Sequence, residues 1–115
     1  MPNRDRPLRV LFVCEYNRRR SATAERVFAK RPDLEVKSAG TAPDALARVN
    51  ARMLAWADIV FVMEHHQRAA LEHMFPEHPA RDRTVCLQIA DEYSFLDAEL
   101  VRLLEERVAP HLVAR

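Results

Sequence analysis

Short apolar runs alternate with amphipathic stretches along the whole chain. Residues 8–13 and 59–63 are nearly continuous apolar runs, which are typical of strands buried on both faces of a sheet. Residues 34–38 alternate between apolar and charged side chains and end near Gly40, which predicts a less buried strand. Residues 84–87 form a fourth short run. The chain is therefore expected to contain four strands.

Helical periodicity fills the stretches between these strands. The spacing of apolar residues predicts helices over 21–30, 45–55, 67–75 and 96–113. Strands that alternate with helices favour a parallel sheet with right-handed crossover connections. The predicted fold class is therefore α/β, a single-domain three-layer sandwich with a four-stranded parallel sheet and helices on both faces.

Length and composition agree with one globular domain. The 115 residues are 49% hydrophobic and 30% charged, and we predict one domain over 1–115, with residues 1–7 as a flexible N-terminal extension. A net charge of +1 gives no reason to expect binding to nucleic acid or to a membrane. The first apolar run is too short for a signal peptide, so a cytoplasmic location is expected. Gly40 is the only glycine, which excludes glycine-rich nucleotide-binding loops.

The cysteines and histidines do not form a known metal or disulfide pattern. The two cysteines, Cys14 and Cys86, are too few for a disulfide framework, and they are not spaced as a metal-binding pair. Cys86 lies within a predicted strand and is expected to be a buried apolar thiol. The cluster at residues 64–66, with His73 beyond it, lacks the spacing of known zinc sites. We expect no metal and no cofactor.

The segment after the first strand carries the candidate chemistry. In open α/β sheets the binding crevice lies beyond the carboxyl ends of the strands. A loop between a strand and a helix can direct backbone N–H groups at an anion, and the same positive field favours a thiolate at Cys14. Arg20 can hold two phosphate oxygens, Ser21 can donate to the sulfur, and Asn17 can stiffen the loop. The predicted phosphate-binding loop comprises Glu15, Tyr16, Asn17, Arg18, Arg19, Arg20 and Ser21.

The motif resembles the opening of the low-molecular-weight protein tyrosine phosphatases, and most closely a short bacterial branch of that family. The resemblance covers most of the chain. Its motifs are residues 10–14, Asn17, Arg20-Ser21, Ala24-Glu25, residues 36–41, residues 58–63 and Asp91-Glu92-Tyr93. It implies a phosphocysteine intermediate, a four-stranded parallel sheet and no metal.

By position, the resemblance assigns roles to residues of this chain. Cys14 resembles the nucleophile, Arg20 the phosphate-binding arginine and Ser21 the partner of the thiolate. Asn17 and Ser38 resemble the pair that supports the loop.

A general acid and a pocket wall complete the expected site. Asp91 follows the fourth strand and is the favoured general acid, whereas Asp97 is better placed to cap the last helix. Tyr93 and Met63 are candidates for the pocket wall. Tyr16, a third candidate for that wall, occupies a position where the family usually has glycine, and it would strain the loop if a positive φ were needed there.

These observations predict a cysteine-dependent phosphomonoesterase, a protein tyrosine phosphatase in type. Its substrate would be a phosphorylated protein or a small aryl phosphate. A phosphate-binding module without catalysis and a thiol-dependent arsenate reductase remain alternatives. Arg18 and Arg19 either bind a second anionic group of the substrate or only raise the local potential. The sequence leaves the oligomeric state open.

Overall fold

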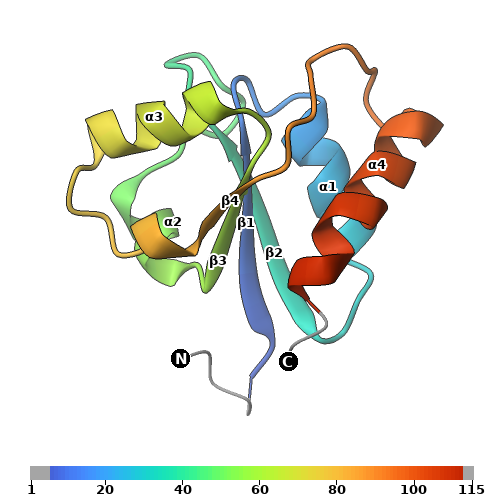
Figure 1. The fold of residues 1–115 in the computed structure, drawn as a ribbon, viewed down its shortest axis with the longest axis horizontal. Coiled ribbons are helices and arrows are strands. Elements are labelled where there is room, and N and C mark those ends of the chain that lie inside the picture. Colours follow the sequence, from blue (N-terminus) through green and yellow to red (C-terminus); the bar gives the residue numbers. More distant parts are fainter. Residues whose placement is uncertain (1–5, 113–115) are drawn as a thin grey trace.

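Four parallel strands form one sheet in the computed structural model, which describes residues 6–112 (Figure 1). The strands are β1 (Leu8–Cys14), β2 (Leu34–Gly40), β3 (Ile59–Val62) and β4 (Thr84–Cys86). Their order in the sheet is β2-β1-β3-β4, so the chain steps over β1 when it passes from β2 to β3. The order therefore switches direction at β1, which is where ligands bind in sheets of this type.

Two helical layers cover the sheet (Figure 1). The helices α1 (Arg20–Phe28) and α4 (Ala98–Val108) pack on one face. The helices α2 (Ala51–Trp56) and α3 (His65–Met74) pack on the other. Short 3₁₀ helices occupy Arg81–Arg83 and Ala109–His111. The predicted three-layer α/β sandwich is thus confirmed.

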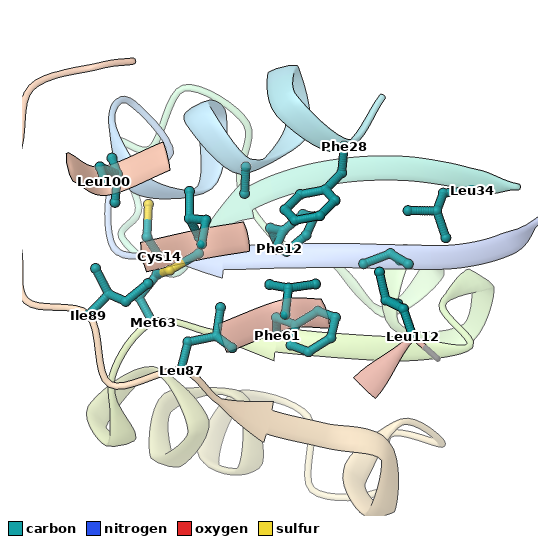
Figure 2. Packing of buried hydrophobic residues seen from close by; sticks show 14 of the residues in the cluster. Phe12, Cys14, Phe28, Leu34, Phe61, Met63, Leu87, Ile89, Leu100 and Leu112 are labelled. Carbon is teal, nitrogen blue, oxygen red and sulfur yellow. The ribbon is translucent and has the colours of Figure 1, made fainter. Parts of the chain in front are cut away.

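Side chains of β1 alternate between the two faces, and each set enters a separate core. Val10, Phe12 and Cys14 point into the core beneath α1 and α4, while Leu11 and Val13 point into the core beneath α2 and α3. Phe12 stacks against Phe28 and Phe61 with ring centroids 5.5 and 5.4 Å apart (Figure 2). Burial on both faces explains why β1 reads as an unbroken apolar run.

The second helix is shorter than the sequence predicts. It begins at Ala51 rather than at residue 45, because the side chain of Asn50 accepts a hydrogen bond from the backbone of Met53 at 2.8 Å and caps the helix. Residues 45–49 instead follow the end of β2, where Gly40 exchanges backbone hydrogen bonds with Ala47 and Val49. The helical spacing of this stretch was misleading because, of its two apolar stripe residues, only Val49 is buried, while Leu46 is exposed.

The last helix also differs from its predicted limits. It begins after Asp97, whose side chain accepts from the backbone of Glu99 at 2.8 Å, and it ends at Val108. The chain then tightens into the second 3₁₀ helix, in which Pro110 occupies one of the first positions. The other helices and strands begin and end within two residues of their predicted limits.

Two further expectations concern the chain start and the second cysteine. Residues 1–5 lie outside the described part of the chain, but Arg6 is tied to the domain by an ion pair with Asp58 at 2.7 Å. Cys86 is half-buried rather than fully buried, because β4 is the edge strand of the sheet. Among residues 6–112, no helix has the length and apolar character needed to cross a membrane, and no group of three potential metal ligands occurs.

Candidate active site

The loop between β1 and α1 surrounds the sulfur of Cys14. The Sγ atom lies 2.9 Å from Ser21 Oγ and accepts a hydrogen bond from the backbone N–H of Asn17 at 3.1 Å. The residue is only 3% exposed, yet it lines a cavity of about 150 Å³. The other residues that line this cavity are Tyr16, Arg18, Arg19, Arg20 and Asp91. The structure therefore brings the predicted loop and the predicted acid together around one sulfur.

Asn17 gives the loop its shape. Its φ angle is 59°, in the left-handed region that asparagine adopts more readily than most residues. Its buried side chain donates from Nδ2 to Ser21 Oγ at 2.8 Å. This bond occupies a lone pair of the Ser21 hydroxyl, whose hydrogen can be donated to the Cys14 sulfur at 2.9 Å or to the carbonyl oxygen of Ala39 at 3.4 Å. Tyr16 has no positive φ, so its replacement of a glycine does not strain the loop.

Gly40, at the end of β2, packs closely against the backbone of the loop. A Cβ atom at this position would lie 2.5 Å from the carbonyl oxygen of Glu15 and 3.0 Å from the backbone nitrogen of Asn17. The next two residues bind the loop, with Thr41 N–H donating to Cys14 O at 3.0 Å and Ala42 N–H to Glu15 O at 2.9 Å. Sequence reasoning missed this role, although the presence of a single glycine in the chain was the signal.

Arg20 is buried and held on one side only. Its Nη1 donates to Glu64 Oε1 at 2.5 Å and to the carbonyl oxygen of Ile89 at 2.8 Å. These two bonds use both hydrogens of Nη1 and leave Nε and Nη2 as donors for a ligand. The Nε atom lies 3.7 Å from Asp91 Oδ1, at the cavity. The side chain, only 2% exposed, is therefore oriented to present a two-donor edge to an anion.

Glu64 is a site residue that the sequence analysis did not identify as such. It caps α3, and its backbone N–H donates to Gln67 Oε1 at 2.7 Å in a capping box. The hydrogen bond from Arg20 keeps the pKa of the Glu64 carboxyl below its usual value. The signal was an acidic residue followed three positions later by glutamine, directly after a buried strand. That pattern places a carboxylate at the functional edge of the sheet.

The two aspartates considered as general acid have different surroundings. Asp91 lines the cavity and its side chain is 42% exposed, so a substrate can reach it. Asp97 caps α4, and its Oδ1 is engaged by the backbone of Glu99. Geometry therefore places only one of the two at the sulfur-containing cavity.

Two predicted pocket-wall residues do not line the cavity, and the predicted support residue Ser38 contacts α1. Met63 is fully buried in the core beneath α1 and α4, because β3 directs it inward, and it does not line the cavity (Figure 2). Tyr93 is half-buried against the same core; this burial, followed by the charges of nearby acidic residues, raises its pKa. The hydroxyl of Ser38 donates to the carboxylate of Glu25 on α1, while Asn17 pairs with Ser21. Asn17 thus contacts the loop directly, whereas Ser38 contacts the helix that follows the loop.

Comparisons with known proteins extend over nearly the whole chain. No protein-family model matches the sequence, and no curated protein matches it. An arginine phosphatase, YwlE from Geobacillus stearothermophilus, matches with 25% identity over 94% of both chains and a TM-score of 0.74. The tyrosine phosphatase Wzb from Escherichia coli K30, solved with phosphate, matches with 21% identity over 90% of this chain and 94% of the other, with a TM-score of 0.73.

A third solved structure carries the family name in full. A low-molecular-weight protein tyrosine phosphatase from T. tengcongensis matches with 23% identity and a TM-score of 0.71. The match covers 91% of this chain and 99% of the other. The resemblance noted in the sequence is therefore confirmed for the fold as a whole.

Proposed function

We propose that this chain, which has the fold of the low-molecular-weight protein tyrosine phosphatases, is a cysteine-dependent phosphomonoesterase. One observation carries the proposal. The Cys14 sulfur sits in a cavity between two hydrogen-bond donors, Ser21 and the Asn17 amide, with the buried Arg20 and the accessible Asp91 at its wall. A nucleophile, an anion-binding edge and a proton donor are thus present within one cavity.

In the first step the Cys14 thiolate attacks the phosphorus of a bound monoester. The S–P bond forms as the P–O bond to the leaving group breaks, and Asp91 gives its proton to the departing oxygen. The free donors of Arg20 and the loop N–H groups stabilise the charge on the three remaining oxygens. The products are a phosphocysteine at Cys14 and a free alcohol or phenol.

In the second step water hydrolyses the phosphocysteine. Asp91, now a carboxylate, removes a proton from a water molecule. The oxygen of that water attacks phosphorus, and the S–P bond breaks. The electron pair returns to sulfur, where Ser21 and the Asn17 amide donate hydrogen bonds to the thiolate. Inorganic phosphate leaves, and both residues regain their starting protonation states.

An aryl phosphate, and phosphotyrosine in particular, is the proposed substrate class. The Tyr16 ring lines the cavity and is 41% exposed, so it can stack on an aromatic leaving group. The solved structures of similar fold include tyrosine phosphatases and an arginine phosphatase. The exposed ring supports the aromatic alternative for this chain.

The two thiols do not suit arsenate reduction, which needs a second cysteine to resolve an intermediate on the first. Cys14 enters the core beneath α1 and α4, whereas Cys86 packs against the core beneath α2 and α3. The thiols therefore lie on opposite faces of the sheet, and a disulfide between them would require the sheet to rearrange. A free thiolate nucleophile does suit the cytoplasm, where thiols stay reduced.

The test compares two substrates and three variants. Wild-type protein should hydrolyse both p-nitrophenyl phosphate and phenyl phosphate, and Cys14→Ser and Cys14→Ala should abolish both activities. Asp91→Asn should slow phenyl phosphate by about 10²–10⁴-fold. The same variant should affect p-nitrophenyl phosphate much less, because p-nitrophenolate leaves without a proton.

Two results would contradict the proposal. Turnover that persists in Cys14→Ser would exclude the sulfur as nucleophile. Equal effects of Asp91→Asn on the two substrates would exclude this residue as the general acid. Binding of phosphate without any wild-type turnover would instead favour the non-catalytic module.

A further inference from the structure

Two arginines at the rim of the cavity have no side-chain partner in the part of the chain that the structure describes. Arg18 and Arg19 both line the cavity that holds the Cys14 sulfur, and both are exposed. Neither side chain makes a hydrogen bond or an ion pair with any residue in the described range 6–112. Arg20, next in the chain, is in contrast neutralised by Glu64.

The other exposed arginines differ in their pairing: within residues 6–112 some pair with carboxylates, whereas Arg26 and Arg52 make no hydrogen bond or ion pair. Arg31 pairs with Asp33 at 2.6 Å, and Arg102 pairs with Glu106 at 3.0 Å. Arg81 lies 4.0 Å from Glu72. What distinguishes Arg18 and Arg19 is therefore not the lack of a carboxylate partner but their place at the cavity that holds the Cys14 sulfur.

The position of these arginines in the fold is electrostatically unfavourable. Arg19 is the N-cap residue of the nine-residue helix α1, and its side chain makes no capping hydrogen bond. The first turn of α1 contains no acidic residue and begins with Arg20. Helix N-termini carry partial positive charge, so adjacent cations destabilise them unless an anion is bound. Three consecutive arginines there are best explained by a strongly anionic ligand.

We propose that Arg18 and Arg19 bind a second anionic group of the substrate, next to the phosphate that reacts. This inference rests on the proposed function, because it names the substrate of the same cavity. The reacting phosphate is held by the free donors of Arg20 and by the loop N–H groups. The rim arginines remain available for a carboxylate or a second phosphate on the same molecule. The preferred substrate is thus a phosphomonoester with an adjacent negative charge, such as an acidic phosphopeptide or a small bisphosphate.

A simpler effect of these arginines would be to attract any phosphate dianion through their general field. Such a field acts on every phosphomonoester alike, whereas contact with a second group acts only on substrates that carry it. The ratio of kcat/KM between matched substrates separates the two effects. A change in absolute activity does not.

The experiment uses two phosphotyrosine peptides of otherwise identical sequence. One has glutamate on both sides of the phosphotyrosine, and the other has glutamine at the same two positions. Wild-type protein should prefer the glutamate peptide by about three- to tenfold at low ionic strength, as expected for two exposed ion pairs. The preference for the glutamate peptide should shrink in about 0.5 M NaCl, because the screening length falls to a few ångströms. The double variant Arg18→Ala/Arg19→Ala should treat the two peptides equally.

A matched control and a second substrate pair sharpen the result. Arg52 is exposed on α2 and lies outside the cavity, so Arg52→Ala should keep the wild-type preference. A comparison of 1,4-phenylene bisphosphate with phenyl phosphate shows whether a small bisphosphate is preferred in the same way.

The outcomes distinguish this inference from the proposed function. If the protein turns over none of these substrates, calorimetric titration of the same peptides measures the preference as a ratio of Kd values, and a preference that depends on Arg18 and Arg19 supports the inference alone. Equal values for the paired substrates in wild type would overturn it. An equal loss on both members of each pair in the double variant would overturn it as well, in favour of the general field.

Discussion

Two arginine–carboxylate pairs lie at opposite ends of the parallel strands, which we call the amino edge and the carboxyl edge of the sheet. They differ in how many of the hydrogen-bonding groups of each partner are paired. At the amino edge, Asp58 accepts two bonds from Arg6, at 2.7 and 3.0 Å, and one from the backbone of Arg9 at 2.9 Å. At the carboxyl edge, Glu64 binds only one nitrogen of Arg20; Nε and Nη2 make no hydrogen bond within residues 6–112, and Nε lies 3.7 Å from Asp91 Oδ1 at the cavity. Donors of a buried arginine that remain free at a cavity can bind an anion, so the second pair points to a ligand rather than to stability.

The surroundings of the two pairs reinforce this difference. Buried polar side chains gather around the carboxyl edge, where a folded chain gains little from them unless they act together. They include Asn17, Arg20, Ser21, Ser38 and Gln67. At the amino edge the Trp56 ring is covered by the exposed Lys37, whose Nζ lies 4.5 Å from the ring centroid. Polar groups are therefore buried at the edge that holds the site.

The largest expected effect comes from replacing the arginines themselves. Arg20→Lys keeps the charge but loses the two-donor edge, and we expect kcat/KM on phenyl phosphate to fall by about 10²–10³-fold. Arg6→Lys makes the same change at the amino edge and should leave turnover unchanged. Steady-state kinetics on both variants, with circular dichroism to verify folding, provide the measurement. Equal losses in the two variants would remove the distinction between the edges.

The next effect concerns the backbone that supports the catalytic loop. Gly40→Ala places a methyl group against Glu15 O, at 2.5 Å, and against Ala45 Cβ, at 2.7 Å. The strand and the loop must move apart, so we expect a loss of about 1–3 kcal/mol in the free energy of unfolding. Turnover should fall as well, because the loop N–H groups shift.

Urea unfolding and kinetics on the same Gly40→Ala preparation test this. A variant that loses stability but keeps full turnover would show that the loop does not depend on this contact.

The sequence was sufficient to predict the helices and strands whose apolar residues repeat at a regular spacing. The continuous apolar run of β1 reports burial on both faces, and the strand–helix alternation predicts the sandwich that is observed. The strand end also identified the loop at Cys14, because the carboxyl edge of a parallel sheet is the place where chemistry collects.

Contacts between residues far apart in the sequence could not be predicted from local spacing. Met63 sits one residue beyond β3, yet it turns into the core rather than into the cavity. The partner of Arg20 is Glu64, 44 residues away, and no local pattern specifies that distance. The partner of Ser38 is Glu25, because α1 crosses over β2 at that point.

A smaller effect on kcat/KM should distinguish the two carboxylates, Glu64 and Asp58. Glu64→Gln removes the charge that orients Arg20, and we expect kcat/KM to fall by about threefold to tenfold, as for the loss of a charge-assisted contact. Asp58→Asn weakens the bonds to Arg6 and Arg9 and should lower stability by about 1 kcal/mol without a change in kcat/KM. Thermal unfolding and kinetics on both variants provide the test. A loss of turnover in Asp58→Asn would contradict the separation of roles.

The smallest effect is the response of the same two pairs to acid. Hydrogen bonds from Arg20 and Arg6 lower the pKa values of Glu64 and Asp58, respectively. A carboxyl whose pKa is lowered in the folded state stabilises the protein above its unfolded pKa, about 4, and this contribution is lost as the pH falls through the folded value. The difference in unfolding free energy between wild type and each variant, Glu64→Gln or Asp58→Asn, should therefore be constant above about pH 5 and shrink toward pH 3. Burial lowers the pKa of His78, but this histidine is present in every variant and cancels in the difference. Urea unfolding at several pH values gives these differences, and a difference that grows toward low pH would show that the arginines do not hold these carboxyls in the charged form.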